Sequence, residues 1–176
     1  MLYLLSLLSK HLKNISLFVL EFSGCTASIN QDHYNCLEAI DGITDNAGNG
    51  WAYGSGGSPA WAIFIIPEKT TMNTLVLMSG QGRNDHRLIV FRVTLTVDGQ
   101  LINLTGLRVR EDPLAQIGDD GTVTLAHAWH ILQLEFNTVS SVQSIRLEVT
   151  KTDASNNNVV LNEIIPKFVE HREGKF

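Results

Sequence analysis

Apolar and polar residues alternate along much of the second half of the chain. Between residues 91 and 98, Phe, Val and Leu alternate with Arg, Thr and Asp, and residues 145–150 repeat this pattern. A period of two is typical of a strand with one buried face. Similar short runs, separated by turn residues, predict strands at Trp61–Ile66, Thr74–Ser79, Arg87–Val97, Leu101–Val109, Thr122–Ala126, Ile131–Phe136, Val142–Lys151 and Val159–Ile165. Short strands at this spacing favour an all-β sandwich or barrel, and no long helix is expected past residue 40.

The segments between these runs have the composition of turns. Asp98-Gly99 predicts a tight β-hairpin, because both residues tolerate the positive φ that such turns require. Gly54-Ser-Gly-Gly-Ser-Pro59 predicts a turn inside one domain and not a linker between two. We expect Trp51 and Trp61 to lie in the core, where each buries a large apolar ring.

The first 21 residues are the most apolar part of the chain. They are similar to a secretory leader, although Lys10, His11 and Lys13 interrupt the apolar run and no basic segment precedes it. Phe22-Ser-Gly-Cys25 resembles a lipoprotein cleavage box with Phe in place of the usual Leu. If the stretch is retained, it predicts a helix over 2–13 and a strand over 15–21. The expected division is an apolar leader at residues 1–22 and a β-sandwich binding domain at residues 23–176.

Composition and charge exclude some classes of function. The 176 residues fit one domain, and the net charge of −5 without any Lys/Arg cluster argues against nucleic-acid binding. The apolar leader is too short and too charged for a membrane span, so membrane contact is expected to be peripheral at most. Cys25 and Cys36 form a disulfide in an oxidising compartment, or remain two buried thiols otherwise.

The stretch from Ala39 to Trp51 concentrates oxygen-bearing side chains among glycines. It contains two Asp, two Asn and three Gly residues within 13 positions, which predicts a tight, irregular loop. Carboxylates, side-chain amides and backbone carbonyls are the hard ligands that Ca²⁺ takes. The loop is therefore either a calcium site or a plain solvated surface loop.

Five short stretches carry a resemblance to a known family. In chain order they are Ala39-Ile40-Asp41-Gly42, Asn49-Gly50-Trp51, Pro59–Ile66, Ser144–Val149 and Leu161–Ile164. Over roughly residues 23–165 this order resembles the galactose-binding-like jelly roll of discoidin domains (coagulation factor V/VIII C-type) and family 32 carbohydrate-binding modules. The resemblance implies a β-sandwich of jelly-roll topology.

The same resemblance implies a structural Ca²⁺ held by the Asp-Gly loop and closed by a Glu of the last strand. By position, the ligands are the side chains of Asp41, Asp45, Asn49 and Glu163, with a backbone carbonyl near Ala39. The family usually has Thr or Ser where Asn49 stands, so this ligand departs from the pattern.

Sugar-binding members of the family use loops at one end of the sandwich. The loop from Ser79 to Arg87 offers Arg83, Asn84 and His86 for sugar hydroxyls, which need donors and acceptors from planar polar groups. Tyr53 or Trp129 is the candidate ring for stacking on the sugar. The alternative is a solvated hairpin loop in which Asp85 pairs with Arg87.

Other chemistry has weaker support. His127 and His130 are two imidazoles three residues apart, but no third ligand stands near them, so an ordinary histidine pair is favoured over zinc. Asp112, Asp119 and Asp120 share one loop region, yet no catalytic motif accompanies them. The chain is therefore not expected to be an enzyme.

The expected function is noncatalytic recognition of a glycan or glycoprotein by a calcium-stabilised, secreted or cell-surface module. The alternative is a structural or adhesive module that binds protein and assembles into a homo-oligomer through its apolar N-terminal segment.

Overall fold

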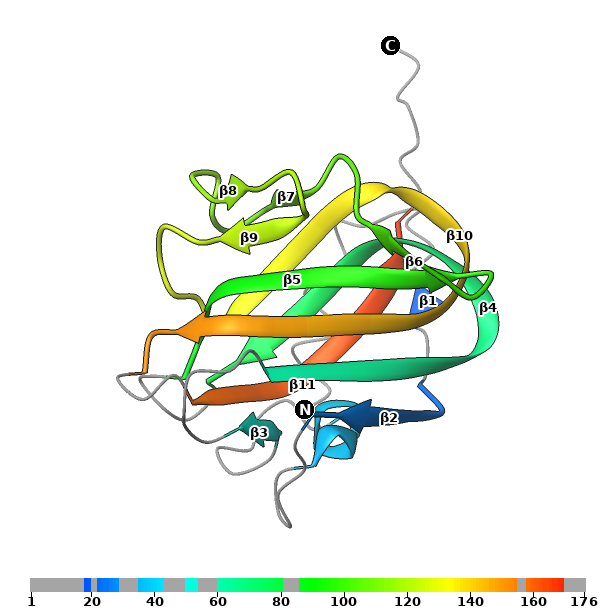
Figure 1. Ribbon diagram of the computed structural model, residues 1–176, viewed down its shortest axis with the longest axis horizontal. Helices are drawn as coiled ribbons and strands as arrows, with labels where there is room; N and C mark the ends of the chain where they lie inside the picture. The colour runs from blue at the N-terminus through cyan, green and yellow to red at the C-terminus, as the bar shows by residue number, and fades with distance from the viewer. Residues whose placement is uncertain are drawn as a thin grey trace, which may run out of the picture.

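The computed structural model describes residues 18–19, 22–28, 35–42, 50–53, 60–80, 86–154 and 158–169. These residues form strands and one short 3-10 helix (Figure 1), which are β1 (Phe18–Val19), β2 (Gly24–Ala27), η1 (Cys36–Ala39), β3 (Trp51–Tyr53), β4 (Ala60–Ser79), β5 (Leu88–Val97), β6 (Gln100–Asn103), β7 (Arg108–Val109), β8 (Gln116–Ile117), β9 (Thr122–Thr124), β10 (Ile131–Thr152) and β11 (Val159–Phe168). The expectation of an all-β chain is confirmed. None of the helices within this part of the chain is long and apolar enough to cross a membrane.

Two bent strands, β4 and β10, link the layers of the fold. Sequence patterns predicted each as two separate strands, and this is wrong because pairing continues across both gaps. Register shifts between Glu135 and Ser144 absorb the irregular spacing, and such shifts let a strand bend without ending. Ser141 takes a positive φ of 61° within this region. In Figure 1 both strands begin and end on the left and bend on the right.

Each half of a bent strand belongs to a different layer. The first half of β4 pairs with β2 and with the second half of β10, which in turn pairs with β5. The second half of β4 pairs with β11 and with the first half of β10. We call these the β5 layer and the β11 layer. Their packed inner faces make the jelly-roll sandwich that the sequence predicted.

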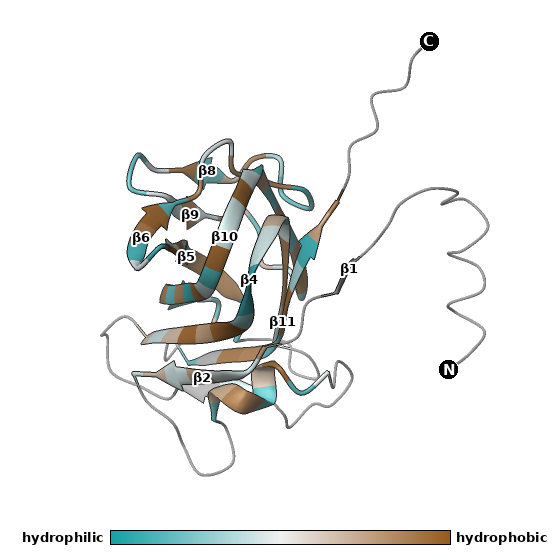
Figure 2. Cartoon of the chain, turned by 90° about the vertical axis from the view of Figure 1, so that its right-hand side faces the viewer, coloured by the Kyte–Doolittle hydropathy of each residue, from teal (hydrophilic) through white to brown (hydrophobic). Residues whose placement is uncertain are grey.

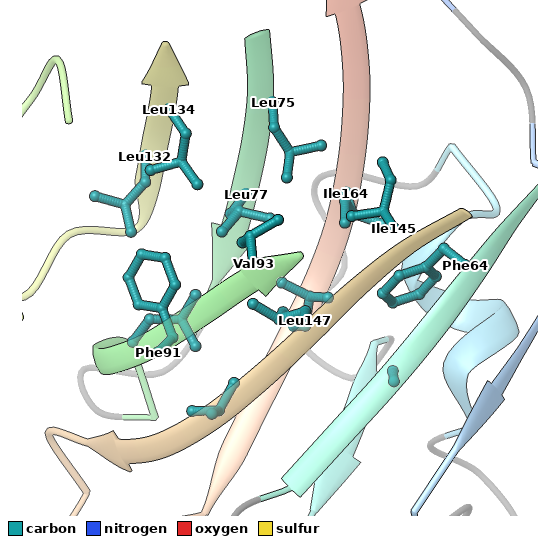
Figure 3. Close-up of a cluster of buried hydrophobic side chains, with 14 of the residues drawn as sticks. Phe64, Leu75, Leu77, Phe91, Val93, Leu132, Leu134, Ile145, Leu147 and Ile164 are labelled. Atoms are coloured by element: carbon teal, nitrogen blue, oxygen red, sulfur yellow. The ribbon is translucent and has the colours of Figure 1, made fainter. Parts of the chain in front are cut away.

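The core lies between the two layers (Figure 3). Phe64, Phe91 and Leu147 from the β5 layer meet Leu75 and Leu132 from the β11 layer, and all five are fully buried. Burial of each such side chain contributes about 1.5–3 kcal/mol. Apolar and polar bands alternate along β4 and β10 (Figure 2), as one-sided burial of a strand requires.

Of the two tryptophans expected in the core, only one is there. Trp51 is fully buried, which confirms its prediction. Trp61 is only partly buried, and the guanidinium of Arg146 lies 4.6 Å from its ring centroid. Ala62 and Phe64 occupy the inward positions of β4, and successive side chains point to opposite faces. Trp61 therefore faces outward.

The Asp98-Gly99 hairpin is confirmed. Val97 pairs with Gln100, and the two turn residues have φ of 48° and 78°. The strand predicted over Leu101–Val109 instead divides into β6, which pairs with β5, and β7, which pairs with β10. The chain changes layers between them at Gly106, whose φ of 63° ends the extended run.

Candidate functional site

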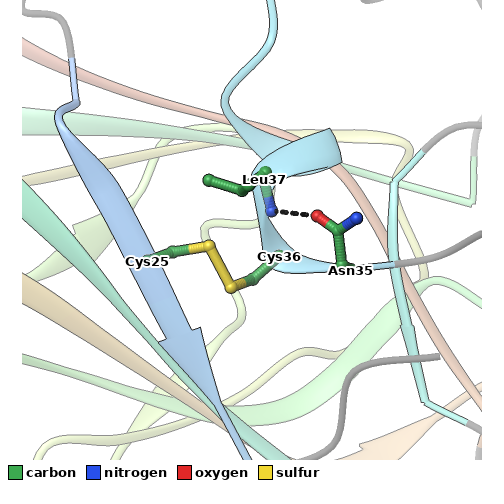
Figure 4. Close-up of a disulfide and its surroundings, with 4 residues drawn as sticks. All are labelled: Cys25, Asn35, Cys36 and Leu37. Atoms are coloured by element: carbon green, nitrogen blue, oxygen red, sulfur yellow. Dashed lines mark hydrogen bonds between the residues drawn. A yellow bond between two sulfur atoms is a disulfide. The ribbon is translucent and has the colours of Figure 1, made fainter. Parts of the chain in front are cut away.

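A disulfide fixes the segment that leads into the Asp-Gly loop. Cys25 on β2 is bonded to Cys36 at the start of η1 (Figure 4). The side-chain oxygen of Asn35 accepts a hydrogen bond of 2.8 Å from the Leu37 N–H and so caps η1. Helix η1 packs against β2, β3 and β11. Asp41 and Gly42 therefore follow directly on a helix that is held in place by these contacts. Of the two states predicted for the cysteines, a disulfide or two thiols, the structure has the disulfide.

Glu163 enters this region through a β-bulge in β11. Leu161 pairs with Ser79 and Glu163 pairs with Met78, so β11 advances two residues while β4 advances one. A bulge of this kind redirects the side chain that follows it. Glu163 is only 5% exposed, and its Oε2 atom is buried without a hydrogen-bond partner among the described residues.

The Asp41 carboxylate lies close enough to Glu163 to affect its charge. Burial raises the pKa of Glu163 to about 7, the negative charge of Asp41 adds to the rise, and a hydrogen bond from the Gly42 backbone N–H opposes it. The charge of Asp41 therefore acts on Glu163, and the role of the two residues as metal ligands stays a prediction. Glu163 is buried and Asp41 is exposed, and two negative charges this close repel each other unless a cation lies between them.

The chain returns to the same region at Gly50. Gly50 has a φ of 143°, and a Cβ atom there would lie 2.6 Å from the Leu161 carbonyl oxygen. Only glycine therefore allows residues 50–53 to run this close to β11. Ala39, the last residue of η1, is fully buried beside them.

The unpartnered oxygen of Glu163 and the adjacent Asp41 fit an oxygen-coordinated cation. Asp45 and Asn49, the other two predicted ligands, lie outside the described residues. Within the described ranges, no group of three or more His, Cys, Asp or Glu side chains is arranged to hold a metal ion. The two carboxylates would need further oxygen ligands to complete a calcium site.

A second set of predicted residues meets at one end of the sandwich. We call it the loop end: β4 and β9 finish there, and β5, β10 and β11 begin there. Ser79 is its centre, because its N–H donates to the His130 carbonyl and its hydroxyl accepts from the Leu88 N–H at 3.3 Å. The Nδ1 atom of His130 lies 3.1 Å from the Ser79 carbonyl oxygen. Segments 86–88 and 129–131 are thus joined through one residue.

His86 stands at the edge of the loop end in a strained conformation. Its φ is 74°, and it is 8% exposed. Left-handed backbone at a residue with a side chain costs of the order of 1–3 kcal/mol and is often found at ligand sites. The neighbouring Arg87 donates to Asp153 from both its backbone N–H and its guanidinium, at 2.6 and 2.7 Å. This ion pair fixes the backbone at Arg87, just before β5.

The other predicted ligand residues divide between described and undescribed parts of the chain. Trp129 is 37% exposed at the loop end, as a stacking platform requires. Tyr53 pairs with Val159 at the start of β11, two strands away from Ser79, but its side chain lies outside the description. Arg83 and Asn84 also lie outside it. Of the five, the structure describes the side chains of His86 and Trp129, whose neighbours Leu88 and His130 both contact Ser79 at the loop end.

Two buried or structural acids were not recognised from the sequence. Asp112 is 2% exposed, and its Oδ2 accepts from the backbone N–H groups of Ala126 and His127 at 2.8 and 3.0 Å. Asp153 anchors Arg87 from the opposite side of the loop end. The residues next to Asp112 and Asp153 in the sequence do not predict these hydrogen bonds, because the bonding partners are 14 or more residues away.

Two of the loop carboxylates, Asp112 and Asp120, have separate hydrogen-bond partners. Asp112 accepts hydrogen bonds from backbone N–H groups. Asp120 is exposed, and hydrogen bonds from the Thr122 backbone N–H and hydroxyl lower its pKa. His127 is exposed and His130 contacts Ser79, so these imidazoles belong to no metal cluster among the described residues.

No protein-family model and no curated protein sequence matches the chain. Solved structures match in fold. SpGH29 superposes with a TM-score of 0.63 at 16% identity over 86% of this chain, and the match spans 28% of the SpGH29 chain. A chitosan-binding module from a Paenibacillus sp. IK-5 chitosanase/glucanase matches with a TM-score of 0.61 at 15% identity, covering 84% of this chain and 96% of the module.

The family 32 carbohydrate-binding module of C. perfringens NanJ, solved in complex with galactose, matches with a TM-score of 0.62 at 10% identity. The match covers 86% of this chain and 98% of that module. At these identities the comparison establishes the architecture. The chain has the galactose-binding-like jelly-roll fold of family 32 carbohydrate-binding modules.

Proposed function

We propose that this chain is a noncatalytic glycan-binding module whose recognition surface is the loop end. The observation that carries the proposal is the location of Trp129, His86 and His130 at the same end of a fold that carbohydrate-binding modules also have. An exposed aromatic ring offers an apolar face for a sugar, and imidazoles offer donors and acceptors for its hydroxyls. On the basis of their sequence positions, we include three further ligand residues in the proposal: Arg83, Asn84 and Tyr53.

Calcium is the second part of the proposal. Glu163, Asp41 and the residues between 43 and 49 would hold the ion, with Asp45, Asn49 and a carbonyl near Ala39 as further ligands. Its role would be structural: a divalent cation neutralises the two carboxylates and fixes the Asp-Gly loop against β11. The unpartnered Oε2 of Glu163 supports this assignment.

The proposed location is outside the cell or at its surface. A disulfide between Cys25 and Cys36 supports an oxidising compartment, because cytosolic thiols are usually kept reduced. A glycan on a cell surface or glycoprotein is then the natural partner. A shallow site of this kind binds each sugar weakly, so multivalent display would strengthen it.

Calorimetric titration with galactose and with chitosan oligosaccharides, with and without Ca²⁺, tests the proposal. Trp129→Ala should weaken binding about tenfold or more, because stacking is lost. Leu101→Ala is the matched control: Leu101 is 63% exposed on β6, away from the loop end. Arg83→Ala should reduce binding as Trp129→Ala does, while Leu101→Ala leaves it unchanged.

A glycan array extends the test to sugars outside this pair. Failure of the chain to bind any sugar on the array would overturn the glycan proposal. If Leu101→Ala and Trp129→Ala weakened sugar binding equally, the binding site would lie somewhere other than the loop end.

A further inference from the structure

A polar cleft opens far from the loop end, where β4 and β10 bend. Glu135 pairs with Thr74 and Val139 pairs with Met72, so three residues of β10 stand opposite Asn73 alone. The interruption leaves a cavity of about 340 Å³. We call it the bend cleft. Asn73 precedes Ser79 by six positions of one strand, which places the cleft roughly 20 Å from the loop end.

One wall of the bend cleft is an ion pair held in a fixed geometry. The Nε atom of Arg108 on β7 donates to the Glu135 Oε2 at 2.6 Å, and Gln133 donates to the other carboxylate oxygen at 3.0 Å. The Glu135 side chain is 21% exposed, whereas that of Arg108 is 70% exposed. The carboxylate is therefore anchored, and much of the guanidinium faces solvent.

The opposite wall is held by a glycine turn. Asn137 donates from its side-chain amide to the Thr105 hydroxyl at 3.1 Å, and its backbone N–H donates to the Thr105 carbonyl at 2.9 Å. Gly106 has a φ of 63°, and a Cβ there would lie 2.6 Å from the Asn137 Oδ1. The positive φ favours glycine at 106, and the two hydrogen bonds to Thr105 orient the Asn137 amide toward this turn.

The base of the cleft is rigid and partly apolar. Asn73 is 6% exposed and exchanges two hydrogen bonds with the backbone of Val169, at 2.8 and 3.0 Å. Phe136 lines the same cavity and is 7% exposed. Polar groups that are already hydrogen-bonded within the chain form a preorganised surface, and binding to such a surface orders few additional groups.

The chemistry of these walls selects hydroxyl groups. A hydroxyl both donates and accepts, so two neighbouring hydroxyls can donate one hydrogen bond to Glu135 and accept one from Arg108. Asn137 adds an amide that can do either. The ion pair has no net charge, which disfavours a strongly anionic or cationic ligand. A volume of 340 Å³ lies at the small end of ligand sites, which span about 300–1,000 Å³.

We propose that the bend cleft is a second binding site, specific for one neutral sugar unit. Arg108, Glu135 and Asn137 contact its hydroxyls, above a floor to which the buried Phe136 contributes. The inference goes beyond the loop-end proposal and stands without it, since the two sites share no residue. With both sites present, one chain contacts a polysaccharide at two places and gains avidity.

Titration of the ¹⁵N-labelled chain with galactose, glucose, mannose and N-acetylglucosamine, followed residue by residue by NMR, tests the site. At least one sugar should shift the amide signals of residues 105–108 and 136–138 at saturable concentrations. Arg108→Ala should weaken this response about tenfold, from loss of one charged hydrogen-bonding partner. Arg108→Lys keeps the positive charge but loses the several N–H donors of the guanidinium, and should weaken the response to sugar less than Arg108→Ala does.

Two controls separate the sites. Lys69→Ala removes another exposed ion pair, that with Asp98, and should leave the cleft response unchanged. Trp129→Ala should alter only the loop-end signals. Shifts in the cleft without shifts at the loop end would overturn the loop-end assignment and support this one.

Two results would overturn the bend-cleft proposal. One is the absence of any shift around residues 105–108 and 136–138 with all four sugars, in a wild-type sample whose melting curve shows that it is folded. The other is a stronger response to galacturonic acid than to galactose, since a preference for an anion contradicts a neutral-sugar site.

Discussion

Two buried carboxylates in this molecule have opposite surroundings. Asp112 is 2% exposed, and two backbone N–H groups donate to one of its oxygens. Glu163 is 5% exposed, but one of its oxygens has no partner within the described residues and Asp41 lies nearby. Among the described residues, Asp112 is satisfied by its own chain, whereas one oxygen of Glu163 is not.

The difference indicates which acid depends on something outside the chain. A buried carboxylate is stable when donors or a cation compensate for the water it has lost. The donors of Asp112 come from the segment just before Trp129, so this acid shapes the loop end. Glu163 faces a second acid, and a cation would compensate for both charges. Substitutions at the two positions should therefore respond differently to Ca²⁺ and to pH.

The largest expected effect is at Asp112. Asp112→Ala leaves the N–H groups of Ala126 and His127 without their acceptor, at about 1–3 kcal/mol each. We expect a loss of about 4 kcal/mol in the free energy of unfolding, equal with and without Ca²⁺, measured by urea denaturation. Asp112→Asn should lose about half as much, because an amide oxygen still accepts.

Asp119→Ala, at an exposed neighbouring position, is the control and should change little. A calcium-dependent loss at Asp112 would contradict the distinction between the two acids.

The disulfide supports the Glu163 region, because η1 packs against β11. Replacing Cys25 and Cys36 together by Ser opens a loop closed over a separation of 11 residues, which should cost about 3 kcal/mol. Because η1 carries the chain into Asp41, the same variant should also bind Ca²⁺ more weakly, as measured by calorimetry. Unchanged calcium affinity would indicate that η1 does not position the Asp-Gly loop.

Much of the fold was predictable because β-strand patterns are local. Alternation along residues 91–98 and the Asp98-Gly99 turn gave β5 and its hairpin to β6 correctly. The continuity of β4 was not predictable, because the polar residues at 67–71 have the composition of a turn. They remain extended because β10 bends with β4 and pairs with it at Thr70 and Met72, and that pairing is not local.

The candidate sites divide in the same way. The pairing of Asp41 with Glu163 came from family resemblance, since no local pattern links residues 122 positions apart. The bend cleft had no sequence signal: Arg108, Asn137 and Asn73 are ordinary polar residues until a bulge opens between them. Trp61 was misplaced because an aromatic residue in an apolar run gives no information on which face it occupies.

Calcium should stabilise the chain through Glu163 and not through Asp112. At 100-fold excess over its dissociation constant, the ion adds about 2.7 kcal/mol, which is roughly 5–10 °C in Tm for a chain of this size. Chelation should remove the gain in wild type and in Asp112→Asn, whereas Glu163→Gln should show no difference between calcium and chelator. Identical melting curves for wild type in both conditions would overturn the calcium proposal.

The smallest expected effect is the pH dependence of the calcium-free chain. Burial and the charge of Asp41 raise the pKa of Glu163 from 4.5 to about 7. Between these values the folded chain binds more protons than the unfolded chain, so the free energy of unfolding should fall as pH rises through this window. From pH 5 to 7 the fall is about 2 kcal/mol, given 1.36 kcal/mol per pKa unit.

Urea denaturation in chelator at several pH values measures this slope, which Glu163→Gln should remove and Asp112→Asn should retain. Saturating Ca²⁺ should also flatten it, because a coordinated Glu163 stays ionised across the range and its folded-state pKa no longer lies above the unfolded value. If Glu163→Gln kept the same pH dependence of the free energy of unfolding, the titrating group would be another residue. Glu163 and Asp112 would then not differ in their response to pH.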